Sequence, residues 1–249
     1  MTITIDLGGQ IALVTGGTKG VGRGIAQRFA DAGATVVVCA RKPVEDLPAG
    51  WHFLPADLRD GDAAFALIDS VVAEFGRLDV LVNNAGGSPV VDTTTASPRI
   101  TEKLVQLNLF AAIYCSQRAN HHMQQSGGGS IVNISSVSGI RATPGTAAYG
   151  AAKAGIINFT ATTAVEWGPK VRVNCVAAGM IRTEQSHLFY GDEAGIAAVG
   201  RTVPLGRIAE SSEIGDACVY LSSPLASYVS GAVLTVHGGG ESPAYLHAT

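Results

Sequence analysis

The sequence carries little charge and has no basic block. Charged residues make up 15% of the 249 residues, and 17 basic against 20 acidic side chains give a net charge of −3. Nucleic acid and anionic membranes are therefore unfavourable partners on electrostatic grounds. No uninterrupted apolar run reaches the ~18 residues that a membrane span needs. The first ten residues, MTITIDLGGQ, lack a basic segment followed by an apolar one, so they do not predict a secretory signal.

Sequence patterns for disulfides and metal ions are absent as well. The cysteines are scattered through apolar contexts with no C-x-x-C spacing, and we interpret them as buried reduced thiols, which favours the cytoplasm. The adjacent His121 and His122 would point about 100° apart on a helix rather than at one ion, so we expect no metal site. The four cysteines are Cys39, Cys115, Cys175 and Cys218.

Apolar residues, at 47% of the chain, are plentiful enough for a large core. Continuous apolar runs typical of strands alternate with helical stretches, which predicts a sheet buried on both faces. This order indicates an α/β fold, with a doubly wound parallel sheet and helices on both faces. No linker or repeat divides residues 1–249, so we expect a single domain. The expected strands are 11–16, 35–40, 51–56, 78–86, 130–136, 171–179 and 232–239, and the expected helices lie near 21–33, 61–75, 98–124 and 147–167.

A glycine-rich turn, TGGTKGVG at 15–22, stands where the first expected strand gives way to a helix. Glycines there let the backbone turn tightly and approach a pyrophosphate, while the helix N-terminus supplies free N–H groups and a positive dipole. The spacing Gly16-x-x-x-Gly20-x-Gly22 differs from the commoner G-x-G-x-x-G. Glycine also serves ordinary turns, but the position after the first strand of a βαβ series favours nucleotide binding.

The stretch AAYGAAKAG (147–155) places one tyrosine and one lysine in an alanine-rich helix. Tyr149 and Lys153 are four residues apart, so they share a helix face, about 5–6 Å apart at Cβ. For a random pair, a core tyrosine and a solvated lysine would be the usual interpretation. Beside a nucleotide-binding turn, a joint functional role is favoured.

Together these motifs resemble those of the short-chain dehydrogenase/reductase family, whose single-domain members have about this length. TGGTKGVG resembles the cofactor turn, NNAG (83–86) the central-strand motif, SIVNISS (130–136) the strand ending in the catalytic serine, and YGAAK (149–153) the Tyr-x-x-x-Lys motif. PLGR (204–207) and SYVSGAVLTVHGGG (227–240) resemble the C-terminal portion. The resemblance covers nearly the whole chain in order. It implies a Rossmann-like fold and hydride transfer between a nicotinamide cofactor and a carbonyl or secondary alcohol.

The resemblance implies that Tyr149 is the general acid/base. Its pKa of ~10 would have to fall by roughly 3 units, or about 4 kcal/mol, for work near neutrality. The Lys153 ammonium and the positive nicotinamide of the oxidised cofactor both favour the phenolate, and Lys153 is also implied to bind the nicotinamide ribose. Ser136, at a strand end, would hydrogen-bond the substrate oxygen. Ser135 fits an ordinary turn better, and Ser138 could add a second contact.

Asn108 interrupts the apolar stretch LVQLNLFAAIY, and a buried amide needs hydrogen-bond partners. It could satisfy neighbouring backbone groups. The resemblance instead assigns it to a water relay towards Lys153, and we adopt that role as the prediction. The implied catalytic set is Asn108, Ser136, Tyr149 and Lys153.

Further cofactor contacts follow from the resemblance by position: PADL (55–58) at the adenine, 84–86 at the fourth strand, and 179–183 at the nicotinamide and phosphates. Two features depart from the family. Residues 178–179 are Ala-Gly where Pro-Gly is usual, which loosens the φ restraint, and 42–50 is too short for the usual full helix. The implied cofactor set is Gly16, Thr18, Lys19, Gly20, Val21, Arg41, Asp57, Leu58, Asn84, Ala85, Gly86, Tyr149, Lys153, Gly179, Ile181 and Thr183.

The end of the second expected strand bears on cofactor choice. An NAD enzyme of this architecture usually has an acidic residue there, which binds the ribose 2′-hydroxyl. Here TVVVCARK places Ala40 at that position, with Arg41 and Lys42 behind it and Lys19 on the facing turn. Arginine grips a phosphate bidentately and lysine adds a point charge. We predict NADP(H), with NAD(H) as the alternative, since an acid such as Asp57 could offset the cations.

Residues 184–207 follow the nicotinamide loop and, by resemblance, form a mobile lid over the substrate. The alternative is an extra helical hairpin packed on the domain. The apolar side chains of the segment predict a hydrophobic ketone or alcohol. The rival within the enzyme class is a 3-oxoacyl thioester reductase, and the rival outside it is a nicotinamide-sensing regulator without turnover. The retained Tyr149 and Lys153 favour catalysis. The apolar lid residues are Leu188, Phe189, Tyr190, Ile196 and Val199.

The helix expected at 147–167 is apolar or small on several faces, which only a deeply buried helix tolerates. The sheet covers one face, so we expect another to meet a symmetry mate. With the tendency of the family added, we predict a homotetramer, with a dimer as the second choice.

Overall fold

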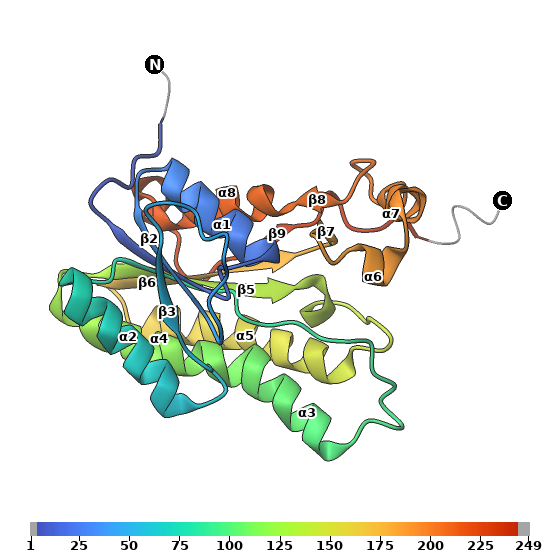
Figure 1. Cartoon of the computed structure of the whole chain (residues 1–249), viewed down its shortest axis with the longest axis horizontal. Helices are drawn as coiled ribbons and strands as arrows, with labels where there is room; N and C mark the ends of the chain where they lie inside the picture. The colour runs from blue at the N-terminus through green and yellow to red at the C-terminus, as the bar shows by residue number, and fades with distance from the viewer. Residues whose placement is uncertain (1–3, 244–249) are drawn as a thin grey trace.

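The computed structural model describes residues 4–243 and has one seven-stranded sheet at its centre (Figure 1). The strand order is β3-β2-β1-β4-β5-β6-β9, and every neighbouring pair is parallel. The order reverses between β1 and β4, which is where open α/β sheets bind ligands. The predicted doubly wound sheet is confirmed. Its strands are β1 (Ile11–Thr15), β2 (Thr35–Ala40), β3 (His52–Pro55), β4 (Val80–Asn83), β5 (Gly129–Ser136), β6 (Val171–Ala178) and β9 (Val233–Val236).

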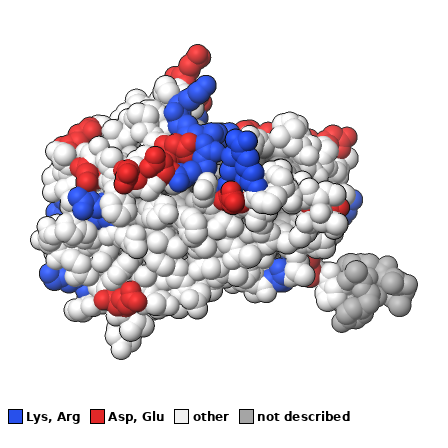
Figure 2. Space-filling model, turned by 90° about the horizontal axis from the view of Figure 1, so that it is seen from below, with Lys and Arg blue, Asp and Glu red and all other residues white. Residues whose placement is uncertain are grey.

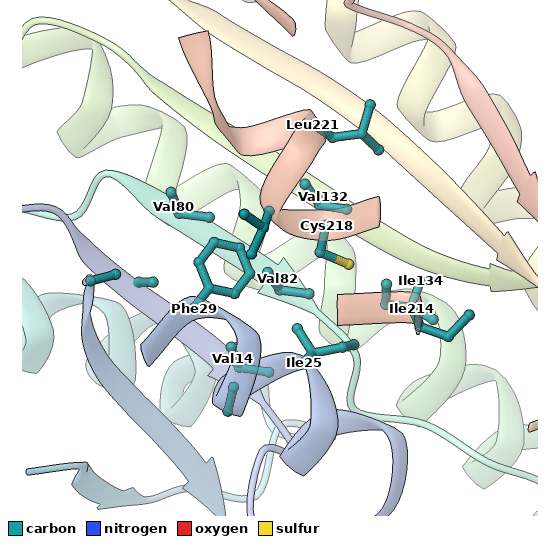
Figure 3. Close-up of a cluster of buried hydrophobic side chains, with 14 of the residues drawn as sticks. Val14, Ile25, Phe29, Val80, Val82, Val132, Ile134, Ile214, Cys218 and Leu221 are labelled. Carbon is teal, nitrogen blue, oxygen red and sulfur yellow. The ribbon is translucent and has the colours of Figure 1, made fainter. Parts of the chain in front are cut away.

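Helices cover both faces of the sheet. Figure 1 shows α1 (Gly20–Asp31) and α8 (Ser211–Ser222) on one side, and α2 (Gly61–Phe75), α4 (Ala111–Gln125) and α5 (Ala147–Glu166) on the other. Figure 3 shows the core under α1 and α8, where valines of β1, β4 and β5 meet Ile25, Phe29, Ile214 and Leu221. A second apolar cluster fills the opposite face. Burial on both faces explains the continuous apolar runs of the strands.

The helix expected at 98–124 is broken into three parts. It consists of α3 (Pro98–Val105), a π-helical turn η1 (Gln106–Phe110) and α4. Asn108 is the buried residue of the π-helical turn. Such turns carry an extra residue and are frequent at functional sites. Residues 41–50 contain turns and no helix, as the short spacing predicted.

The C-terminal third holds elements that the sequence pattern did not predict. Helix α8 begins at a capping box formed by Glu210 and Glu213. The expected lid contains α6 (His187–Tyr190) and α7 (Glu193–Gly200), and its two ends meet in a small sheet of β7 (Ile181–Arg182) and β8 (Ala209–Glu210). Two short 3₁₀ turns complete the list, η2 (Val137–Gly139) and η3 (Pro224–Ala226).

Buried polar side chains tie the two central strands to the helices behind them. Asn83 and Asn133 are register partners in β4 and β5, and the Asn83 Nδ2 donates to the Asn133 Oδ1 at 2.8 Å. Asn83 also donates to Ser116 Oγ of α4 at 2.8 Å, and Asn133 donates to Thr160 Oγ1 of α5 at 2.9 Å. All four residues are buried. The network fixes β4, β5, α4 and α5 relative to one another.

The four cysteines are buried and unpaired, as predicted. Within residues 4–243, no helix combines the length and the apolar character that crossing a membrane requires.

Candidate active site

A cavity of about 1190 Å³ opens at the carboxyl edge of the sheet. It extends from the turn after β1, past the ends of β2 to β6, to the first residues of the expected lid. Every predicted cofactor residue lines it, together with Ser136, and Asn108 is the one predicted site residue that does not. The predicted residues on its wall are Gly16, Thr18, Lys19, Gly20, Val21, Arg41, Asp57, Leu58, Asn84, Ala85, Gly86, Ser136, Tyr149, Lys153, Gly179, Ile181 and Thr183.

The glycine-rich turn is compact because its glycines permit it. Gly16 and Gly20 have positive φ values of 65° and 55°, and a Cβ on Gly22 would lie 2.3 Å from the Gly16 carbonyl oxygen. The turn is joined to the end of β4 by Thr15, whose Oγ1 accepts hydrogen bonds from the backbone N–H groups of Asn84 (2.9 Å) and Ala85 (3.0 Å). This pairing explains why the two motifs occur together: each holds the other in place.

Tyr149 and Lys153 share one face of α5, as their spacing predicted. The Lys153 Nζ lies 5.6 Å from the centre of the Tyr149 ring and donates to the Ile134 carbonyl oxygen at 2.8 Å. Lys153 is 4% exposed, and this burial lowers its pKa from 10.5 to about 8. Burial also raises the pKa of Tyr149, while hydrogen bonding with Ser136 acts in the opposite direction. Desolvation is the larger of these two effects, and the depression of the phenol pKa by Lys153 together with the oxidised nicotinamide stays a prediction.

The serines at the end of β5 have different partners. Ser135 Oγ donates to the Lys153 carbonyl oxygen at 2.8 Å and so joins β5 to α5. Ser136 Oγ accepts from the Ser138 N–H at 3.2 Å and lies beside Tyr149 in the cavity wall. Ser136 is therefore the serine whose hydroxyl lies beside the phenol.

Asn108 is bonded to backbone groups. Its Oδ1 accepts from the Gly87 N–H at 2.8 Å, and its Nδ2 donates to the carbonyl oxygens of Gly87 and Leu104, both at 2.9 Å. A Cβ on Gly86 would lie 2.6 Å from the Asn108 Oδ1 and 3.3 Å from the Lys153 Nζ. Asn108, Gly86 and Lys153 thus pack in one cluster, in which Asn108 holds the loop after β4.

Three charged residues of the cavity wall were missed in the sequence, namely Arg59, Lys103 and Glu184. Arg59 pairs with Asp57, with its Nε donating to the Asp57 Oδ1 at 2.8 Å, and it lowers the Asp57 pKa. Glu184 accepts a hydrogen bond from the Gly20 N–H at 3.0 Å. The two-residue spacing of Asp57 and Arg59 could have suggested the first pair. Nothing local in the sequence indicates the contact between Gly20 and Glu184, because 164 residues separate the two.

The depressed pKa of Lys153 predicts that stability depends on pH. Between pH 8 and 10.5 the unfolded chain keeps a proton that the folded chain has lost, so the free energy of unfolding rises with pH. Between about pH 7 and 10, we expect the free energy of unfolding of wild type to rise by about 2–3 kcal/mol relative to that of Lys153→Met. Urea unfolding of both proteins at several pH values measures this difference, and a difference that stays constant would contradict the prediction.

Comparisons with known proteins agree with this geometry. Residues 16–241 match the family model described as Enoyl-(Acyl carrier protein) reductase. The chain is 36% identical to a 3alpha-hydroxysteroid dehydrogenase of Mediterraneibacter gnavus, over 94% of this chain and 97% of that one. It is also 36% identical to a 3-oxoacyl-(acyl-carrier-protein) reductase of Chlamydia muridarum, over 92% and 96%. A Sinorhizobium meliloti structure assigned as a short-chain alcohol dehydrogenase superposes with a TM-score of 0.89 at 35% identity, covering 95% of this chain and 98% of that chain. The chain therefore belongs to the short-chain dehydrogenase/reductase family, and it is an enzyme that oxidises or reduces alcohol and carbonyl groups with a nicotinamide cofactor.

Proposed function

We propose that this enzyme transfers a hydride between NADP(H) and a hydrophobic ketone or secondary alcohol, with Tyr149 as its general acid/base. The proposal rests on one observation: Ser136, Tyr149 and Lys153 line the same cavity as the glycine-rich turn. Ligands of open α/β sheets bind at this edge.

The residues present fit a dinucleotide. The backbone at Gly22 leaves no room for a side chain, and the N-terminus of α1 lies in the same wall, which suits a pyrophosphate. Asp57 and Leu58 would hold the adenine, Asn84 to Gly86 the central part, and Gly179, Ile181 and Thr183 the nicotinamide end. When bound, the nicotinamide supplies or accepts the hydride.

Each catalytic side chain has a distinct task in the proposed reaction. Ser136 hydrogen-bonds the substrate oxygen and stabilises the charge that develops on it. The Tyr149 hydroxyl gives that oxygen a proton in reduction, and the Tyr149 phenolate takes the proton from the alcohol in oxidation. The Lys153 ammonium favours the phenolate and opposes the effect of burial. The Asn108 contacts support a positioning role for the loop beside Lys153, and its part in a water relay stays a prediction.

Replacement of the proposed acid/base tests the mechanism. Tyr149→Phe should retain cofactor affinity while turnover falls by roughly 10²–10⁴-fold, because the proton donor is lost and the ring remains. Cofactor titration and initial rates on a substrate established for wild type measure the two effects. Wild-type turnover in the variant would refute the assignment.

The lid supports a hydrophobic substrate. We propose that 184–207 acts as this lid, on a single domain spanning residues 1–249. Leu188 and Phe189 of α6 are 68% and 57% exposed, whereas Ile196 of α7 is buried.

A 3-oxoacyl thioester reductase remains the alternative, and a non-catalytic nicotinamide sensor is disfavoured by the complete catalytic set. Cofactor consumption measured across ketones, alcohols and acyl thioesters, with both cofactors, separates these functions.

The charges near the adenine end favour NADP(H) over NAD(H). β2 ends at Ala40, and Arg41 lines the cavity with Lys19 and Lys42. Within residues 4–243 none of these three cations forms an ion pair. Asp57, the acid that could repel a 2′-phosphate, is already paired with Arg59.

Removal of two of these cations tests the cofactor choice. Arg41→Ala combined with Lys19→Ala should raise the Michaelis constant for NADPH by about tenfold or more, with a much smaller effect for NADH, because charge-assisted phosphate contacts are lost. Arg23→Ala is the matched control, since Arg23 lies on α1 and pairs with Asp46. A strong wild-type preference for NADH, or an unchanged ratio in the double variant, would contradict the proposal.

The outer face of α5 supports an oligomer. It exposes small or apolar residues, among them Ala151, Ala154, Ala161 and Val165, the last being 84% exposed. The side of the molecule that carries α2, α4 and α5 shows few charged groups over most of its breadth (Figure 2). We propose that this face contacts other copies in a homotetramer, with a dimer as the second choice.

We also propose that the protein is cytoplasmic, because its cysteines are buried free thiols.

Light scattering at micromolar concentration tests the assembly. A particle of about four chain masses is expected, and Val165→Glu should shift it to smaller species, because a charge would be buried at the contact. A monomeric wild type would rule out the oligomer.

A further inference from the structure

The first residue of the lid reaches back to the glycine-rich turn. The Glu184 Oε1 accepts a hydrogen bond from the Gly20 N–H, the first backbone amide of α1. The N-cap residue of this helix, Lys19, provides no side-chain hydrogen bond, and the first turn of α1 contains no acidic residue. Glu184 therefore supplies the negative charge that a helix N-terminus favours.

The same position is the part of the cavity that suits a pyrophosphate. Glu184, Lys19 and Gly20 all line the cavity, together with the catalytic residues. A carboxylate and a phosphate cannot both accept from the Gly20 N–H, and their like charges repel at contact distance. A pyrophosphate that occupies the turn must therefore displace the Glu184 carboxylate.

A second cavity beside Glu184 has room for the displaced side chain. Glu184 also lines this second, polar cavity of about 420 Å³. The walls of that cavity include Arg182 and His187, together with the carboxylates of Glu193 and Glu210. Arg182 pairs with Glu193 at 2.7 Å in the wall of this cavity, so the cation of the cavity lies beside Glu193.

A displacement of Glu184 acts on the lid directly. The Thr183 N–H donates to the Ser186 Oγ at 2.9 Å, which holds 183–186 in a tight turn, and α6 starts at His187. The chain before this turn is fixed by the pairing of β7 with β8. The hydrogen bond of Glu184 therefore attaches the first residue of the lid to the glycine-rich turn, two residues after the end of the paired strand β7.

We propose that Glu184 is an internal competitor for the cofactor's diphosphate, so that cofactor binding and release of the lid from the turn form one equilibrium. This inference rests on the proposed function, because it takes the turn to be the diphosphate site. The competition lowers cofactor affinity, and it leaves the lid docked on the turn until a nucleotide arrives.

The test compares Glu184→Gln with Glu193→Gln, which removes the same charge from the same segment but lies in the contact with Arg182. ADP-ribose is the probe, because it carries the diphosphate without the nicotinamide. Calorimetry should show about 2- to 5-fold tighter binding to Glu184→Gln than to wild type, the range that an exposed charge at a helix N-terminus supplies, and no change for Glu193→Gln.

Hydrogen exchange of residues 183–190 gives the second readout. ADP-ribose should speed exchange there in wild type, and Glu184→Ala, which lacks the acceptor that glutamine retains, should exchange fast without it and respond no further. Equal affinities, or tighter binding with no change in exchange, would overturn the competition. The proposed function fails on a different result, the absence of NADPH and NADH binding or of hydride transfer in wild type.

Discussion

The hydrogen bond between the side chains of Asn83 and Asn133 is the contact on which the site depends most. A buried amide is costly unless it is paired, and the Asn83 Nδ2 is paired although the Oδ1 of the same side chain has no partner. The hydrogen bonds of Asn83 and Asn133 fix β4 against β5, and those to Ser116 and Thr160 fix both strands against α4 and α5. The residues just beyond these strands line the proposed cofactor half and the proposed catalytic half of the cavity. A shift of either strand would separate Ser136 from Tyr149, or the glycine-rich turn from the loop after β4.

Much of the fold and of the site could be predicted because the relevant signals are local. The inner strands β1, β2 and β4 are buried along most or all of their length, so they stood out as continuous apolar runs, whereas the edge strands β3 and β9 contain no buried residue. The spacing of Tyr149 and Lys153 fixes their common face by helix geometry alone. The resemblance placed the cofactor residues, and parallel strands bring their carboxyl ends to one edge, so all of these residues line one cavity.

The rest depends on contacts between distant parts of the chain. Helix α8 has serine, glycine and aspartate among its residues, and its packing against α1 outweighs their weak helix propensity. The π-helical turn at Asn108 is held by contacts with Gly87, which composition does not reveal. The raised pKa of Tyr149 arises from burial, a property of the folded chain. The Asp57–Arg59 pair likewise shows its effect on the charge of the cavity only once the strands are assembled.

The packing of α1 against α8 has a consequence for biosynthesis. Arg28 of α1 pairs with Asp216 of α8 at 2.5 Å, and Gly24 lies so close to Ser211 that a Cβ there would be 2.3 Å from its Oγ. The helix that follows the glycine-rich turn is thus completed by residues 188 positions later in the chain. Until α8 has been synthesised, Ile25 and Phe29 lack part of the apolar packing that buries them in the folded molecule. The first helix of the chain therefore reaches its final packing only after α8 has been synthesised, and a product truncated before α8 would leave part of the apolar face of α1 exposed.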